Sequence, residues 1–246
     1  MAADIRRSEP GDLYTAFHAV RYAFVLRLLK DHITDARCRV LDIGRSKLTA
    51  LIARTFGVRV DSLGFDKDQD TDTGKHYQFD LNDSQDAAHW RTDLGSYDVL
   101  VMAEVIEHLH TSPARVLAFL KTLLTTNGVL IIQTPNAVAL HKRLKLLLGR
   151  NPYELIRENV TDPGHFREYT AAELRRFAEH AGLVLERCSH ESYFDYRCMV
   201  NTQGGRHAPR WLRAIVTVCY SLLPPTLRPC ITCVARRPPA QRGSRP

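Results

Sequence analysis

A chain of 246 residues is long enough for one large α/β domain with short additions and a complete hydrophobic core. Its hydrophobic content of 44% and charged content of 25% are typical of an ordinary globular domain. The net charge of +7 would suit nucleic acid, an anionic membrane or an acidic substrate, but part of it lies in the terminal RRPPAQRGSRP. We interpret this segment, 236–246, as a disordered basic tail, so charge alone does not indicate a nucleic-acid-binding protein.

Residues 1–38 are predicted to form helices that cap the domain. The segment YTAFHAVRYAFVLRLLKDHI, residues 14–33, carries apolar residues at helical spacing. The preceding MAADIRRSEPGD is polar and has no features of a secretory signal. We therefore expect a cytoplasmic protein whose six scattered cysteines are reduced thiols.

Residues 39–235 alternate predicted strands with predicted helices. The apolar runs predict seven strands, at 39–44, 58–66, 77–81, 97–103, 129–135, 183–189 and from 229 onward. No helix is expected between the second and third strands. The expected fold is α/β, with a doubly wound, mostly parallel, seven-stranded Rossmann-like sheet and helices on both faces. In such a sheet, ligands bind at the carboxyl ends of the strands.

Acidic residues follow four successive predicted strands, at Asp42, Asp66, Asp80 and Glu104. A single Asp at such a position is commonly a helix N-cap, but four in order are difficult to attribute to capping. Carboxylates there can accept hydrogen bonds from an ammonium group, a ribose diol or an exocyclic amine. S-adenosylmethionine carries all three groups, so the pattern favours this cofactor.

Six segments carry a family resemblance: VLDIGRS, LGFD, FDLND, YDVLVMAEVIEHL, NGVLIIQTPN and GHFREYTAAELRRFAEHAGL. Together, in this order, they resemble the class I S-adenosylmethionine-dependent methyltransferases. EVIEHL with GHFREYT is similar to the branch that methylates small molecules, which includes O-methyltransferases of ubiquinone, sugar and natural-product biosynthesis.

The resemblance implies a role for each strand end. It places the methionine moiety at Asp42 and Gly44, the ribose at Asp66, the adenine at Asp80 and Leu81, and the sulfonium beside Ala103 and Glu104. The family usually has glycines where this chain has Ser46 and Leu48. Ser46 fits if its backbone avoids positive φ, and Leu48 fits in a helix that begins early. We expect a shortened form of the cofactor loop.

Two histidines are candidates for the base that removes a proton from a hydroxyl acceptor. His108 lies four residues after Glu104, and His165 lies in GHFREYT beside Arg167 and Tyr169, which we expect to contact the acceptor. The alternative roles are a structural histidine bonded to a backbone carbonyl for His108 and an exposed loop histidine for His165. No ordered ligand set surrounds them, so we expect no metal.

Two apolar segments have more than one interpretation. Residues 136–170 form an insertion whose helix, 140–148, either covers the acceptor site or faces a membrane, as the resemblance to quinone methyltransferases implies. Residues 211–223 are too short to span a bilayer. They either lie on a membrane surface or, as we favour, pack on the sheet. Cys230 and Cys233 form a lone C-x-x-C that we interpret as two strand cysteines without zinc.

The sequence therefore predicts a methyltransferase that binds S-adenosylmethionine and methylates a hydroxyl group of a small molecule. The alternative is a non-catalytic scaffold or partner subunit with the same fold. The sequence only weakly supports a dinucleotide site, because the loop lacks the glycines of the dinucleotide fingerprint. Nucleic acid is disfavoured as a partner because no Pro-Pro-aromatic motif follows the fourth strand. The oligomeric state cannot be predicted.

Overall fold

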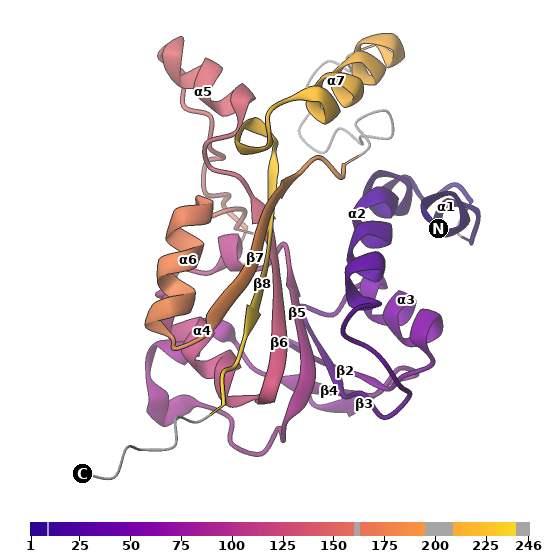
Figure 1. Ribbon diagram of the computed structural model, residues 1–246. Helices are drawn as coiled ribbons and strands as arrows, with labels where there is room; N and C mark the ends of the chain where they lie inside the picture. Colours follow the sequence, from indigo (N-terminus) through magenta and orange to yellow (C-terminus); the bar gives the residue numbers. More distant parts are fainter. Residues whose placement is uncertain (9, 160–162, 195–208, 240–246) are drawn as a thin grey trace.

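The computed structural model describes residues 1–8, 10–159, 163–194 and 209–239, which build one sheet with helices on both faces (Figure 1). The sheet has eight strands in the order β3-β4-β2-β1-β5-β6-β8-β7. The strands are β1 (Val40–Ile43), β2 (Val60–Gly64), β3 (Gln69–Asp70), β4 (Lys75–Gln78), β5 (Tyr97–Ala103), β6 (Leu124–Pro135), β7 (Val184–Glu191) and β8 (Cys230–Arg236). Only β3 and β8 run against the common direction.

Seven α-helices accompany the strands in the described ranges. They are α1 (Ala2–Ser8), α2 (Leu13–Leu29), α3 (Lys47–Phe56), α4 (Pro113–Thr122), α5 (Leu140–Leu147), α6 (Ala171–His180) and α7 (Arg210–Leu222). Short 3₁₀ turns are η1 (Leu81–Gln85), η2 (Ala87–His89), η3 (Ile106–His108) and η5 (Pro225–Leu227). In Figure 1, α2 and α3 lie on one side of the sheet, and α4 and α6 lie on the other.

Side chains that alternate along the central strands fill two separate cores. On β5, Leu100 and Met102 pack in the core beneath α4 and α6, whereas Val99 and Val101 pack in the core beneath α2 and α3. This alternation follows from the two-residue repeat of a strand that is buried on both faces. The predicted doubly wound α/β fold is confirmed.

The segment after β1 forms the compact loop that its residues predict. Ser46 has φ of −149°, and its hydroxyl accepts a hydrogen bond from the backbone N–H of Leu48. Thr49 reciprocates, because its hydroxyl accepts from the backbone N–H of Ser46, which completes a capping box. The helix closes at Gly57, whose φ of 64° suits glycine. Ser46 therefore replaces a glycine without strain, and α3 begins early, at Lys47.

Three local predictions are corrected. The polar loop after β2 contains an eighth strand, β3, which pairs with β4 as a hairpin. The segment before β5, where a helix is predicted at 84–94, forms the two 3₁₀ turns η1 and η2, which begin at the N-caps Asp80 and Asp86. The tail begins later than expected, since Arg236 belongs to β8 and the backbone of Arg237 bonds to Gly128. Residues 240–246 lie outside the described ranges.

The cysteines of β7 and β8 differ from the expected reduced thiols. Cys188 and Cys233 are direct neighbours across the antiparallel pair, and they form a disulfide. The close approach of opposite residues on antiparallel strands makes this pairing possible. Cys230 is a buried thiol in the same strand as Cys233.

Helices α5 and α7 extend past the end of the sheet (Figure 1). No described side chain of α7 is buried, so the favoured prediction that residues 211–223 pack on the sheet is wrong. In α5 only Lys142 is buried, Leu140 is half-buried, and Leu144, Leu146 and Leu147 are exposed. The helix therefore does not cover the rest of the domain with its apolar side chains.

Candidate active site

The end of β1 presents a buried carboxylate beside a glycine. Asp42 is almost fully buried, and its Oδ2 accepts a hydrogen bond of 2.6 Å from the Thr49 hydroxyl. Burial raises the pKa of Asp42 to about 7, against the opposing effects of Thr49 and the Arg21 charge. Gly44 has φ of 78°, and a Cβ there would lie 3.0 Å from Val105. Only glycine fits both the conformation and the space.

The ends of β2 and β4 are more open. Asp66 is exposed, and no hydrogen bond to its side chain is found in the described parts of the chain. Asp80 caps η1 by accepting from the backbone N–H of Asn82, and Leu81 is buried behind it. A cavity of about 630 Å³ lies here, and Asp80 and Phe65 are among its lining residues. Phe65 is 71% exposed, which makes its ring available to a planar ligand.

The end of β5 places Ala103 and Glu104 at the centre of the same edge of the sheet. Glu104 has φ of 58°, a conformation that is uncommon for a residue other than glycine. Its Oε1 accepts a hydrogen bond of 3.3 Å from the Tyr193 hydroxyl. Burial raises the pKa of Glu104, and the charge of Arg21 offsets part of that rise.

Arg21 of α2 is a site residue that the sequence did not identify. It is 4% exposed, and its Nε and Nη1 have no hydrogen-bond partner among the described residues. Its charge lowers the pKa of both Asp42 and Glu104, which locates the guanidinium near the ends of β1 and β5. The available signal was an arginine within the apolar run 14–33. A buried guanidinium with unpaired N–H groups favours an anionic ligand, such as a carboxylate.

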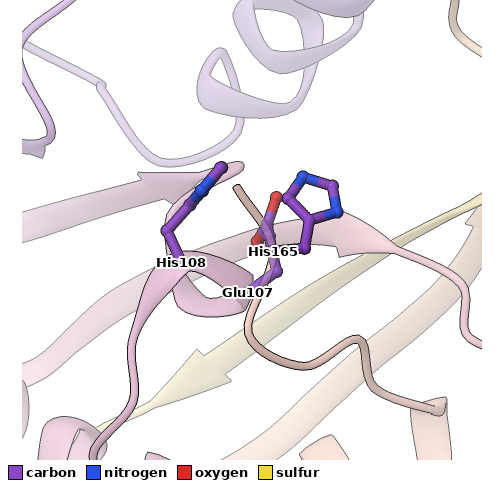
Figure 2. A group of neighbouring side chains, drawn as sticks. All are labelled: Glu107, His108 and His165. Carbon is purple, nitrogen blue, oxygen red and sulfur yellow. The ribbon is translucent and has the colours of Figure 1, made fainter. Parts of the chain in front are cut away.

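Glu107, His108 and His165 form a compact group (Figure 2). Glu107 and His108 come from η3, whereas His165 comes from the end of the insertion. One possible ligand atom from each residue lies within 4.8 Å of the other two, and the histidine rings meet edge to face at 4.7 Å. Glu107 is fully buried, and burial with the nearby Glu104 raises its pKa well above the usual range.

Both histidines have their Nδ1 atoms occupied. His108 Nδ1 lies 2.9 Å from the Gly164 carbonyl oxygen, which can only accept, so Nδ1 carries the proton. This is the structural contact that we named as the alternative for His108. His165 Nδ1 lies 3.3 Å from Glu168 Oε1. Burial and the neighbouring His108 lower the pKa of His165 to about 4, so the ring is neutral at pH 7.

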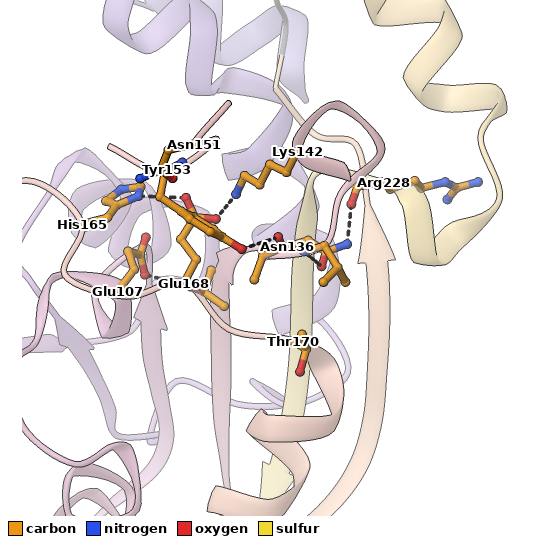
Figure 3. A network of polar contacts seen from close by, with 12 residues as sticks. Glu107, Asn136, Lys142, Asn151, Tyr153, His165, Glu168, Thr170 and Arg228 are labelled. Carbon is orange, nitrogen blue, oxygen red and sulfur yellow. Dashed lines mark hydrogen bonds and ion pairs between the residues drawn. The ribbon is translucent and has the colours of Figure 1, made fainter. Parts of the chain in front are cut away.

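Glu168 connects His165 to the helix of the insertion (Figure 3). It forms an ion pair with Lys142 of α5, and the two side chains are only 7% and 6% exposed. Burial lowers the pKa of Lys142 to about 8. The hydroxyl of Tyr153 donates to the Ala137 carbonyl, which fastens the insertion close to the same pair. A buried charge pair therefore holds α5 to the end of the insertion that carries His165.

Arg167 and Tyr169 are directed toward α6. Arg167 is exposed and forms an ion pair with Glu173. Tyr169 is buried in the core, and its ring meets Phe177 edge to face. The backbone N–H of Arg167 does approach the site, because it donates to the Glu107 carbonyl. The structure thus brings His108 and His165 together but does not place the side chains of Arg167 and Tyr169 with them.

Comparison with known families agrees with this architecture. A family model described as a methyltransferase domain matches residues 14–187, which is well over half of the chain. The protein therefore belongs to the methyltransferase-domain family, and its fold is that of the class I S-adenosylmethionine-dependent methyltransferases. A search of curated protein sequences found no significant match.

Solved structures share this fold at low sequence identity. A SAM-dependent methyltransferase from Archaeoglobus fulgidus is 13% identical, with a TM-score of 0.52 over 92% of this chain and 99% of that one. The 1,6-didemethyltoxoflavin-N1-methyltransferase of Burkholderia thailandensis is 15% identical, with a TM-score of 0.53 over 97% and 87%. Geranyl diphosphate C-methyltransferase from Streptomyces coelicolor is 12% identical, with a TM-score of 0.51 over 96% and 98%.

The buried Lys142–Glu168 pair generates a stability prediction. Lys142→Met leaves a buried carboxylate without its cation, so we expect the free energy of unfolding to fall by about 3–5 kcal/mol. Lys142→Met combined with Glu168→Gln removes both charges and should recover most of that loss. Urea denaturation of the single and double variants measures the coupling.

Lys145→Met serves as the control, because Lys145 is exposed on the same helix. This change should alter the unfolding free energy by no more than about 0.5 kcal/mol. Equal losses in the two single lysine variants would show that the buried pair does not hold the insertion.

Proposed function

We propose that this methyltransferase transfers the methyl group of S-adenosylmethionine to a hydroxyl group of a small molecule. The observation that carries the proposal is the contact of His165 with Glu168 next to the β5 strand end. A hydroxyl must lose its proton when it is methylated, and a neutral histidine oriented by a carboxylate can accept that proton. The acceptor could be a sugar, a phenol or quinone intermediate, or another natural product.

The names of the structural relatives support the cofactor more than the acceptor. The Burkholderia enzyme is described with 1,6-didemethyltoxoflavin and S-adenosylhomocysteine bound, and the Streptomyces enzyme with Mg²⁺, geranyl diphosphate and S-adenosylhomocysteine. Those two enzymes methylate nitrogen and carbon, respectively, according to their names. The choice of a hydroxyl acceptor therefore rests on the histidine and its carboxylate.

The side chains at the strand ends suit each part of the cofactor. Asp42 can accept from the ammonium group, Arg21 can donate to the carboxylate, and the exposed Asp66 can accept from the ribose hydroxyls. Phe65 and Asp80 line the cavity that the adenine would enter. The bound cofactor would supply an electrophilic methyl group for in-line displacement.

The remaining step is proton removal by the chain's own residues. Glu168 accepts a hydrogen bond from Nδ1–H of His165, so the proton stays on Nδ1 and the lone pair of Nε2 is available for the proton of the acceptor hydroxyl. Lys142 forms an ion pair with Glu168 in a buried position, which fixes the carboxylate beside His165. Close positioning and the exclusion of water contribute most of the rate enhancement in this type of transfer.

A bound divalent cation is a second way to activate a hydroxyl at this site. Glu107 Oε1 lacks a hydrogen-bond partner within the described ranges, and the imidazole rings of the two histidines beside it are common metal ligands. The base proposal requires no cation. A chelator separates the two, because it would abolish turnover only if the cation is the activating group.

A non-catalytic relative of the same fold is the other candidate. The absence of loop glycines favours it, but Ser46 satisfies the backbone geometry of the loop as a helix cap. Buried carboxylates at strand ends that bind no ligand would lower the stability of the fold without serving a function. We therefore favour the enzyme.

Asp66→Ala tests the ribose assignment. Removing the carboxylate should weaken binding of S-adenosylhomocysteine by about 1.5–3 kcal/mol, the range for hydrogen bonds that involve a charged group. Isothermal titration calorimetry measures this change. Asp72→Ala is the matched control, because Asp72 is exposed in the neighbouring loop. A dissociation constant that Asp66→Ala leaves unchanged would remove the ribose assignment.

His165→Ala tests the base. We expect turnover at saturating cofactor and acceptor to fall by about 10²–10⁴ while affinity for S-adenosylhomocysteine stays nearly constant. Glu168→Gln should lower turnover in the same direction, because it weakens the orientation of the ring. The measurement is a methyl-transfer assay with each candidate class of acceptor.

Two further variants are needed: His108→Ala tests the competing base, and His89→Ala is the control. His89 is exposed on η2 and should behave as wild type. If only the folded His108 variant loses turnover, the base is His108. If a chelator abolishes wild-type turnover and Mg²⁺ restores it, the activating group is a cation.

A further inference from the structure

The end of the molecule that carries α5 and α7 exposes large apolar side chains. On α5 and its C-terminal edge these are Leu144, Leu147 and Leu148, and on α7 they are Trp211, Ile215 and Leu222. Leu147 is 82% exposed and Leu222 is 78% exposed. We call this surface the apolar end. Side chains of this size are seldom gathered in solvent unless the surface has a partner.

The two segments that form the apolar end carry charge of one sign. Residues 136–153 and 209–239 contain no Asp or Glu. Arg143, Lys145 and Arg150 are exposed next to the leucines of α5. The surface therefore combines apolar side chains with cations, which is the composition of segments that lie on anionic membranes.

Specific contacts hold the apolar end in place. The His141 ring of α5 meets the Tyr220 ring of α7 edge to face at 5.9 Å. The Asn136 side chain donates to the carbonyl oxygens of Thr226 and Arg228, which joins the end of β6 to the segment after α7. Lys142 fixes α5 to Glu168 from below (Figure 3). The exposed leucines are therefore displayed on a supported element.

The two helices can lie on a bilayer. Within the described ranges, no helix has both the length and the hydropathy of a membrane-spanning segment. Helices of 8 and 13 residues measure about 12 and 20 Å, less than the thickness of a hydrocarbon core of about 30 Å. Both are long enough to rest along the surface.

We infer that the apolar end binds the surface of an anionic lipid bilayer. The leucines and Trp211 enter the boundary between headgroups and acyl chains, and Lys145 and Arg150 contact lipid phosphates. A second copy of this chain is a poorer partner, because it would bring the same cations to the interface without acidic residues to pair with them.

Sedimentation of the full-length protein with vesicles tests this inference, independently of catalysis. Wild type should sediment with vesicles of phosphatidylcholine and phosphatidylglycerol, and more weakly with phosphatidylcholine alone or in high salt. Lys145→Gln with Arg150→Gln should weaken partitioning about 25-fold, at about fivefold for each charge. Leu147→Ser with Leu148→Ser should weaken it by at least about tenfold.

Val184→Ser is the matched control, because Val184 is also an exposed apolar residue but lies on β7. It should partition like wild type. Wild-type protein that stays in the supernatant with anionic vesicles would overturn the inference. So would a dimer in analytical ultracentrifugation that the two leucine changes abolish, since the apolar end would then be an interface between copies.

Discussion

Buried ionisable groups at the carboxyl ends of β1 and β5 constrain the rest of the structure. Asp42, Glu104 and Glu107 lie within a few residues of these strand ends, and Arg21 is the nearby cation that α2 supplies. Carboxylates removed from water cost free energy unless a proton, a hydrogen bond or an opposite charge compensates them. The raised pKa values of the three acids show that the protein compensates them only in part. A ligand with a complementary charge would supply the missing compensation, so the arrangement favours a ligand-binding site.

Helix α2 and the insertion, which lie far apart in the sequence, each contribute a residue to this site. Arg21 reaches it from the N-terminal helix, and His165 reaches it from the end of the insertion, where it lies against His108. The Lys142–Glu168 pair joins these site residues to α5. The same helix carries the exposed leucines of the apolar end. One short element thus carries the buried Lys142 on its inner side and exposed leucines on its outer side, and our two proposals concern these two sides.

The fold was largely predictable because its signals are local. Long apolar runs predicted the parallel strands, and Pro113 and Gly57 marked the start of one helix and the end of another. The same runs showed where each strand ends. The sequence therefore predicted that Asp42 and Glu104 lie at the carboxyl edge of the sheet. The two-residue strand β3 has too few side chains to leave such a signal.

The rest of the site depends on contacts between distant residues. Lys142 and Glu168 are 26 positions apart, and the burial of Arg21 is decided by the elements that pack against α2. Cys188 and Cys233 are neighbours only because β7 and β8 pair in one register. The apolar pattern of α7 suited packing on the sheet equally well, yet no described side chain of this helix is buried.

The pH dependence of S-adenosylhomocysteine binding, measured by calorimetry, tests the central claim that Asp42 belongs to a cofactor site. In the free protein, burial raises the pKa of Asp42 to about 7, whereas the cofactor's ammonium group requires the ionised carboxylate. Binding below about pH 7 must therefore release a proton, and the dissociation constant should rise about tenfold for each pH unit of acidification. Asp42→Asn should bind weakly with little pH dependence. No binding at any pH, or wild-type affinity that is constant through this range, would contradict the account.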